Sequence, residues 1–221
     1  TVEGGSIEYV TRLHRALLAM AVDIRVGGDV QAVRRTPMGA EVRVAGDEWE
    51  RFAEVVFAAH SDDALRLLTD PAPQEQTALG KITYQTNTAV LHADPALMPR
   101  RRRCWASWNY VEPVNRTAPG IGLTYWMNSL QPIPMDDLHF VTLNTTQSIR
   151  EELIYDQATF RHPVYDVAAL AAQETVRAIN GQNRTWFCGA WMKNGFHEDG
   201  LASGLDVAEA ILERPVQEVA A

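Results

Sequence analysis

Residues 187 to 204 read Phe187-Cys188-Gly189-Ala190-Trp191-Met192-Lys193-Asn194-Gly195-Phe196-His197-Glu198-Asp199-Gly200-Leu201-Ala202-Ser203-Gly204, and this stretch decides the fold. An apolar strand leads into a turn that contains Gly189 and Gly195. The helix that follows begins with unpaired backbone N–H groups and the positive end of its dipole. Gly200 and Gly204 share one helix face, where small residues permit close approach of a ligand or another element. This arrangement is suited to holding an anionic or electron-rich group.

Short elements alternate in the first part of the chain. Apolar residues at helical spacing after Gly4-Gly5-Ser6 predict a helix over residues 7–18. Three short β-rich runs with a turn at Gly39 are typical of a meander, and they cover residues 22–26, 30–34 and 41–44. Residues 54–59 form an apolar run that predicts a strand buried on both faces, and residues 61–68 predict a helix.

A β-rich block follows Pro71 and Pro73, which suggest a boundary. Alternating apolar and polar residues predict an antiparallel sheet, with strands over residues 82–92, 104–111, 122–128 and 140–144. In a regular strand Trp108 and Tyr110 share one face and Asn109 lies on the other. The end of the chain predicts a helix over residues 167–179, a strand over 185–188 and a helix over 198–212.

The stretch quoted first resembles the carboxy-terminal flavin motif of the flavin-containing amine oxidase superfamily. In that motif a strand ending in Gly leads to Gly-aromatic-x-Glu and a helix of small residues. Gly195-Phe196-His197-Glu198 matches this pattern and Gly204 matches its later glycine. Gly4-Gly5 and residues 54–59 also resemble family segments in the same order. A bacterial group of predicted NAD/FAD-binding oxidoreductases is similar in residues 195–201 and 105–110.

The resemblance implies an enzyme that transfers hydride from an organic substrate to FAD, as amine oxidases and desaturases do. It implies that the helix start lies at the pyrimidine edge of the flavin and stabilises negative charge on reduction. The cofactor-binding residues that it implies are Val30, Gly189, Ala190, Gly195, Phe196, His197, Glu198, Asp199, Gly200 and Leu201. The sequence identifies no catalytic acid or base.

One departure from the family is the lack of a Gly-x-Gly-x-x-Gly sequence, so the amino-terminal Rossmann βαβ motif is absent from these residues. We therefore expect the carboxy-terminal portion of a longer enzyme, in which FAD binds to the full-length protein. On its own, this portion is expected to bind FAD weakly or not at all.

The fold class expected from these patterns is α+β. Residues 1–70 and 181–221 are expected to form the remaining part of a flavin-binding α/β domain. Residues 71–180 are expected to form a substrate domain with a mixed or antiparallel sheet and flanking helices. Aromatic and amide side chains there could wall a small-molecule cavity, although each ring could equally serve core packing. The candidate substrate residues are Trp108, Asn109, Tyr125, Trp126 and Asn128.

Composition excludes several other classes. A net charge of −8 argues against a nucleic-acid binder, and residues 100–103, a run of arginines, are better explained as a solvated loop. No apolar stretch is long enough to span a bilayer, and reduced Cys104 and Cys188 fit a cytoplasmic protein. His197-Glu198-Asp199 does not complete a metal site, so no metal is expected.

Two other functions stay open. The chain could be a non-catalytic binding or interaction domain that keeps a flavoprotein-like fold, an interpretation strengthened by the missing dinucleotide motif. It could also be an assembly subunit with the aromatic block as its interface. The sequence leaves the substrate, the electron acceptor and the oligomeric state undetermined.

Overall fold

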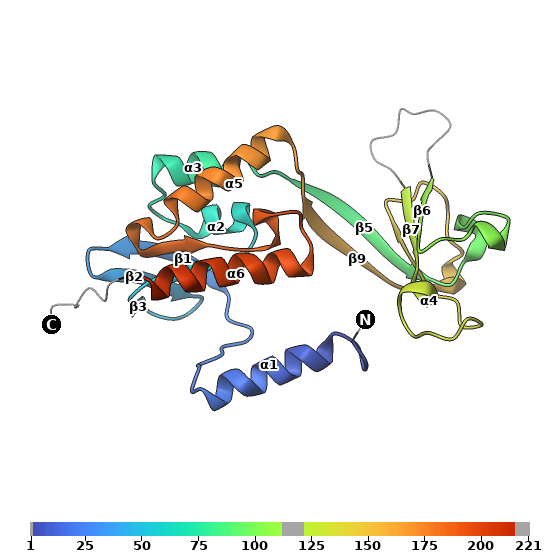
Figure 1. The fold of residues 1–221 in the computed structure, drawn as a ribbon, viewed down its shortest axis with the longest axis horizontal. Helices are drawn as coiled ribbons and strands as arrows, with labels where there is room; N and C mark the ends of the chain where they lie inside the picture. Colours follow the sequence, from blue (N-terminus) through green and yellow to red (C-terminus); the bar gives the residue numbers. More distant parts are fainter. Residues whose placement is uncertain (1, 112–121, 215–221) are drawn as a thin grey trace. The chain divides into compact units, whose positions relative to one another are not determined.

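The computed structural model describes residues 2–111 and 122–214, which form two compact units (Figure 1). The first unit comprises Thr1–Ile24 and Thr86–His162, and the second comprises Arg25–Gln85 and Pro163–Ala221. Residues 71–85 and 163–180 were expected to belong to the substrate domain, but they lie in the second unit. They do so because Pro73 begins a helix of the same core and does not separate two domains.

The second unit contains a meander and a two-stranded parallel sheet. In the meander, β1 (Val30–Thr36), β2 (Gly39–Val44) and β3 (Glu50–Phe52) pair antiparallel in that order. Gly39 has φ +150°, and a Cβ there would lie 2.2 Å from the carbonyl oxygen of Phe52, so the turn requires glycine. The strand expected at residues 22–26 is wrong, because this segment finds no ladder partner; the third strand is β3.

In the parallel sheet, β4 (Val55–Phe57) pairs with β10 (Thr185–Phe187). Both apolar runs form strands as expected, but Val56 is 44% exposed, so β4 is not buried on both faces. Phe187 of β10 joins a core cluster with Phe57, whose ring stacks on it at a centroid distance of 5.5 Å. Trp186 and Cys188 join a second cluster on the opposite face. Both faces of β10 are therefore covered, as expected for a parallel strand.

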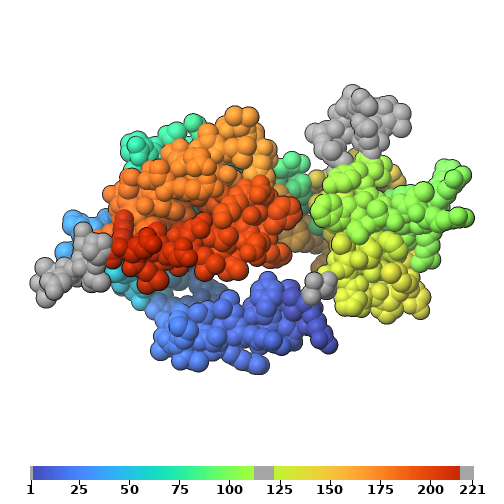
Figure 2. Space-filling view, viewed as in Figure 1, coloured from blue at the N-terminus to red at the C-terminus, as the bar shows by residue number. Residues whose placement is uncertain are grey.

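Helices pack against these strands. Among the described residues of this unit, the helices are α2 (Ser61–Leu67), α3 (Pro73–Gly80), α5 (Val167–Ile179) and α6 (His197–Leu212). Short 3₁₀ turns follow α5 and β10, at η4 (Gln182–Arg184) and η5 (Ala190–Met192). Helices α5 and α6 lie next to each other on the surface of the unit (Figure 2).

A buried ion pair ties the meander to α3. The Arg35 guanidinium donates to both carboxylate oxygens of Glu75, at 3.0 and 2.9 Å, and the two side chains are 7% and 4% exposed. Glu75 also accepts from the Ala72 N–H at 2.7 Å, and Arg35 contacts Asp70. Both Glu75 oxygens are thus hydrogen-bonded, whereas the buried Arg35 Nε has an ion contact with Asp70 at 3.1 Å but no hydrogen-bond partner among the described residues. The hydrogen bonds that are made offset part of the cost of burying two charges.

Removing one partner should leave a buried, partly uncompensated charge. We expect Glu75→Ala to lower the free energy of unfolding by about 3 kcal/mol, the lower end for a broken buried pair, because Asp70 still contacts Arg35. Urea unfolding followed by circular dichroism measures this. Arg66→Ala, at an exposed pair with Asp63, is the control and should cost less than about 1 kcal/mol. Equal losses in both variants would refute the role of the pair.

The first unit is built on a five-stranded sheet. Its order is β6-β7-β8-β5-β9, with β5 (Tyr84–His92), β6 (Trp108–Val111), β7 (Gly122–Trp126), β8 (Phe140–Leu143) and β9 (Ile154–Pro163). The paired registers of β6, β7, β8 and β5 are antiparallel, as the alternation predicts. Its other elements are α1 (Ile7–Ala19), α4 (Met127–Leu130), η1 (Pro95–Leu97), η2 (Arg102–Cys104) and η3 (Glu151–Leu153).

One face of this sheet contains a buried network of polar side chains. On the buried face, the Thr124 and Thr142 hydroxyls are 2.8 Å apart, and Thr142 is 2.7 Å from His92 Nε2. His92 Nδ1 accepts from the Asp94 N–H, so its Nε2 carries the proton and donates to Thr142. Burial lowers the pKa of His92, against an opposing effect of Asp94. The histidine is thus held neutral as part of the core.

Asp94 anchors the segment that follows β5. Its carboxylate accepts from the Arg150 guanidinium at 3.1 and 3.2 Å and from the backbone N–H groups of Arg150 and Ala96. The hydrogen bond from Arg150 is the main cause that lowers the pKa of Asp94 from 3.8 to about 2. This carboxylate joins η1 to the chain before β9.

The lowered pKa predicts an acid-sensitive contribution to stability. Because the folded pKa lies below the unfolded one, the contribution is present above pH 3.8 and is lost as the pH falls to about 2. NMR titration of the Asp94 carboxyl carbon should give a midpoint near the lower value. Asp94→Asn should remove this part of the acid transition, and the exposed control Asp136→Asn should retain it. A midpoint near 3.8 in the folded protein would contradict the prediction.

Two general expectations can be compared with the structure. Cys104 and Cys188 are both free thiols; Cys188 is buried as expected, but Cys104 is exposed and is not a core thiol. Within the described ranges, none of the helices has the length and apolarity needed to span a bilayer.

Candidate functional site

The strand–turn–helix order expected around Gly189 is present in the second unit. β10 ends at Phe187, and Gly189 follows with φ +147° as the chain turns into η5. Gly195 has φ +92°, and after Phe196 the helix α6 begins at His197. We refer to residues 189–196 as the exit loop.

Side chains from outside the exit loop bind its backbone at several points. Gln173 donates from its amide nitrogen to the carbonyls of Trp191 and Lys193, both at 2.8 Å. Arg177 donates to the Met192 carbonyl at 2.7 Å. The indole of Trp191 in turn donates to the Ala59 carbonyl, just after β4. These contacts fix the loop before any ligand binds, which is the property of a preorganised site.

The Ser203 side chain connects the first turns of α6 to the exit loop by hydrogen bonds. Its hydroxyl oxygen accepts from the Gly189 N–H at 2.9 Å and lies within donor range of the Gly189 and Gly200 carbonyls, at 3.0 and 2.9 Å. A Cβ added to Gly200 would be 3.7 Å from the Ala190 backbone nitrogen, an ordinary packing distance. Gly204 has open space beside it, so of these two small residues only Gly200 serves packing within the unit.

Asp199 has a structural role at the helix start. Its Oδ2 accepts from the N–H groups of Asn194 and Phe196, at 3.2 and 3.0 Å. The carboxylate therefore satisfies donors that precede α6 and adds a negative charge to its first turn. Phe196, His197, Glu198 and Leu201 are all exposed around that turn. Together they form the accessible surface of the candidate site.

Val30, the remaining implied cofactor residue, begins β1 of the same unit. It is half-buried and lies opposite Val44, next to an irregularity in the β1–β2 register. Such an irregularity leaves local backbone groups outside the regular ladder.

The candidate substrate residues of the first unit do not share one surface. Trp108 and Tyr125 are cross-strand neighbours on the more exposed face, with an edge-to-face ring contact at 6.0 Å. Tyr110 lies on this face two residues further along, as the alternation predicts. Trp126 lies on the opposite face, against Trp105 at 5.3 Å. Burial, with a smaller effect of Tyr110, raises the pKa of Tyr125.

The two amides of that set are occupied by backbone. Asn109 donates to the carbonyls of Ala106 and Thr124 and accepts from the Ala106 N–H. Asn128 donates to two carbonyls of the following loop and accepts from the His139 N–H. Both side chains are buried, so their hydrogen bonds shape loops and do not face a cavity.

Sequence reasoning missed the residues that hold the exit loop. Gln173, Arg177 and Ser203 lie on helices, where their spacing gives no sign of contacts to a distant loop. Tyr165 was also missed, and its hydroxyl would be 2.6 Å from a Cβ at Gly195. Burial, followed by the neighbouring Tyr84 and Asp199, raises the pKa of Tyr165 to about 12.

Gly195 combines a backbone requirement with a steric one, and the two can be separated. We expect Gly195→Ala to lower the free energy of unfolding by about 1–3 kcal/mol, because φ +92° strains any L side chain and the methyl group meets Tyr165. Tyr165→Phe removes the hydroxyl. The double variant should therefore recover part of the loss and keep the strain. Thermal unfolding of the unmodified protein, the two single variants and the double variant measures the backbone strain and the steric contact separately. If the losses of the single variants simply add in the double variant, Tyr165 does not restrict the loop.

Comparison with known proteins finds similarity in structure only. No protein-family model matches the sequence, and no curated protein matches it. A protein assigned as a protoporphyrinogen oxidase from Exiguobacterium sp. 255-15 is similar at 15% identity and a TM-score of 0.64, over 97% of this chain and 52% of that one. Putrescine oxidase bound to putrescine is similar at 14% identity and 0.60, over 96% and 53%.

A CLA-producing fatty acid isomerase from P. acnes is also similar, at 14% identity and a TM-score of 0.54, over 85% of this chain and 48% of that one. The chain thus spans about half the length of these proteins. The expected α+β fold class is confirmed. This chain has the fold of about half of each of these proteins, which agrees with the resemblance stated for residues 187–204.

Proposed function

We propose that the chain is the carboxy-terminal half of an FAD-dependent oxidoreductase of the amine oxidase and desaturase type. In this proposal the intact enzyme transfers hydride from a small organic molecule to flavin, in the cytoplasm. The observation that carries the proposal is the exit loop, which is fixed by Gln173, Arg177 and Ser203 and opens onto the start of α6. The fold shared with putrescine oxidase supports it.

The residues at the start of α6 fit a flavin. An electron-rich ring edge would be held by the first-turn N–H groups, beside exposed Phe196 and Leu201. When bound, FAD would supply the hydride acceptor. The chain itself would orient the ring and stabilise charge through the helix dipole. Val30 and the loop glycines would belong to the same site, and Asp199 would keep the helix start in shape.

The edges of the parallel sheet support the half-enzyme proposal. Asn180 covers the outer edge of β10 by exchanging two hydrogen bonds with the Phe187 backbone, at 2.8 and 3.0 Å. In the described parts of the chain, β4 pairs with β10 alone. The Phe57 carbonyl accepts from the Cys188 N–H, so the backbone polar groups of Phe57 point towards β10. Those of the preceding residue, Val56, therefore point to the opposite edge of β4. That edge is suited to a further strand, as a nucleotide-binding half would provide.

The outer surface of α6 is apolar as well. Leu201, Leu205 and Leu212 follow a helical spacing and are more than half exposed. An apolar stripe of this kind favours contact with another element over contact with water. In the proposal it contacts the nucleotide-binding half of the intact enzyme.

The substrate would lie against the aromatic face of the first unit. Trp108, Tyr110 and Tyr125 line that face and offer flat apolar surface. Asn109 and Asn128 would act indirectly, by holding the neighbouring loops. Trp126 would support the sheet from its buried face.

The test is the absorption spectrum of the whole open reading frame that encodes these residues, expressed and purified by gel filtration. Retained flavin bands are expected for that protein, with weak or no FAD binding by the 221-residue chain alone. A folded, colourless protein that FAD cannot reconstitute would reject the enzyme and favour a flavin-like fold kept for binding.

The helix start has its own measurement in the flavin-loaded protein. Glu198→Ala removes a negative charge beside the first turn, so reduced flavin should become easier to form and its midpoint potential should rise by about 5–20 mV. Glu209→Ala, near the other end of the same helix, is the matched control and should leave the potential unchanged. If the unmodified protein and both variants had the same flavin midpoint potential, the flavin would not lie at the start of α6.

A further inference from the structure

A second candidate binding site lies behind the exit loop, between α5 and α6. It is a pocket of about 430 Å³, within the range of small-molecule sites. Its floor is apolar and includes Trp186, Phe187, Met192 and Val207. All of its lining residues belong to the second unit, and none belongs to the exposed surface at the start of α6.

The lining of the pocket contains more cations than carboxylates. Arg177, Lys193 and Arg214 line it, and Asp206 is the single carboxylate among the lining residues. The whole chain, in contrast, has a net charge of −8. Arg177 and Arg214 are paired with Glu174 and Glu54, which lie outside the lining and offset part of the charge of these arginines. The surface that faces a ligand is therefore more basic than the chain as a whole.

The two arginines are fixed by backbone contacts. Arg177 donates to the Met192 carbonyl, and Arg214 donates to the Gly181 carbonyl. The guanidinium of Arg214 also lies 4.7 Å from the centre of the Trp186 ring. These positions are set without a ligand, so binding would cost little ordering of the arginines.

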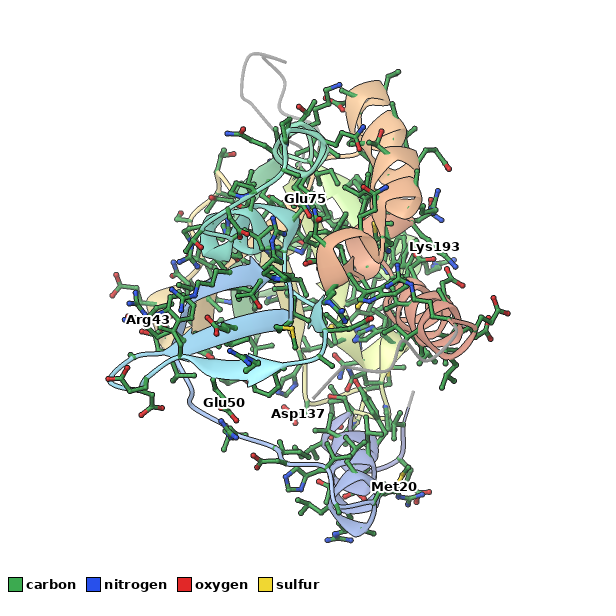
Figure 3. All side chains as sticks on the ribbon, turned by 90° about the vertical axis from the view of Figure 1, so that its left-hand side faces the viewer. Met20, Arg43, Glu50, Glu75, Asp137 and Lys193 are labelled. Carbon is green, nitrogen blue, oxygen red and sulfur yellow. The ribbon has the colours of Figure 1, made fainter. Side chains whose placement is uncertain are left out.

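Lys193 is the cation best placed to receive a ligand. It lies between α5 and α6 (Figure 3), and its ammonium is 3.5 Å from Asp206, a longer contact than a close ion pair. A flexible lysine held by one partly exposed carboxylate can exchange that contact for a ligand anion.

We propose that this pocket binds a small amphipathic organic anion, with its flat apolar body on the Trp186 and Met192 floor and its anionic group at Lys193. The apolar floor accounts for the body of the ligand, and the excess of cations accounts for its charge. The site is separate from the proposed flavin surface and does not depend on FAD.

The probe is 2-naphthoate, titrated into the 221-residue chain and followed by calorimetry and by the NMR signals of the Met192 methyl group and the Trp186 indole. We expect saturable shifts at both residues. Neutral 2-naphthalenemethanol should bind roughly tenfold more weakly, the loss expected for one charge-assisted hydrogen bond. Equal affinity for the two compounds would overturn the assignment of charge, and no shift at either residue would overturn the site.

Variants separate the pocket from general charge effects. Lys193→Ala should weaken naphthoate binding roughly tenfold and leave the neutral compound unaffected. Lys193→Arg should retain most of the affinity. Lys81 is the other lysine of the sequence and is exposed at the end of α3, so Lys81→Ala is the matched control and should bind as the parent does. An equal loss in both alanine variants would reduce the effect to net charge and reject the pocket.

Discussion

The parallel pairing of β4 with β10 is the constraint on which the second unit depends. It joins residues 55–57 to residues 185–187, which are distant in sequence. The stacked rings of Phe57 and Phe187 fill the core on one side of this pair, and α6 covers Trp186 on the other. Since the exit loop leaves directly from β10, its position relative to Ala59 is set by the same pairing. Loss of this pairing would release the loop and the start of α6 together.

Local sequence signals predicted many of the elements, because each signal depends on neighbouring residues. They did not predict α3 (Pro73–Gly80), β3 (Glu50–Phe52) or β9 (Ile154–Pro163). The glycine turn after β10 and the alternation of β7 reflect conformational freedom and the period of a strand, which a sequence shows directly. The segment at residues 22–26 has strand-like residues but no strand beside it. A strand requires a partner, and pairing is decided by the tertiary fold.

The site was harder to predict because its contacts are long-range. Asn109 and Asn128 have the chemistry of ligand-binding amides, yet nearby backbone groups use their hydrogen-bonding capacity. Gln173 and Ser203, which no motif marks, hold the exit loop from two different helices. Adjacent Tyr125 and Trp126 separate onto opposite faces of their strand. A motif therefore locates a loop, whereas the residues that fix it are identified only from the fold.

The exit loop separates two surfaces that have different chemistry. Met192 and Lys193 line the basic pocket, whereas Phe196, His197 and Glu198 surround the helix start. A ligand in one place can influence the other by moving the loop between them or by moving α6, which borders both surfaces. Gln173, Arg177 and Ser203 oppose such movement, because each would lose hydrogen bonds to loop backbone. The geometry therefore favours independent binding at the two surfaces. Coupling through the loop would require these hydrogen bonds to break.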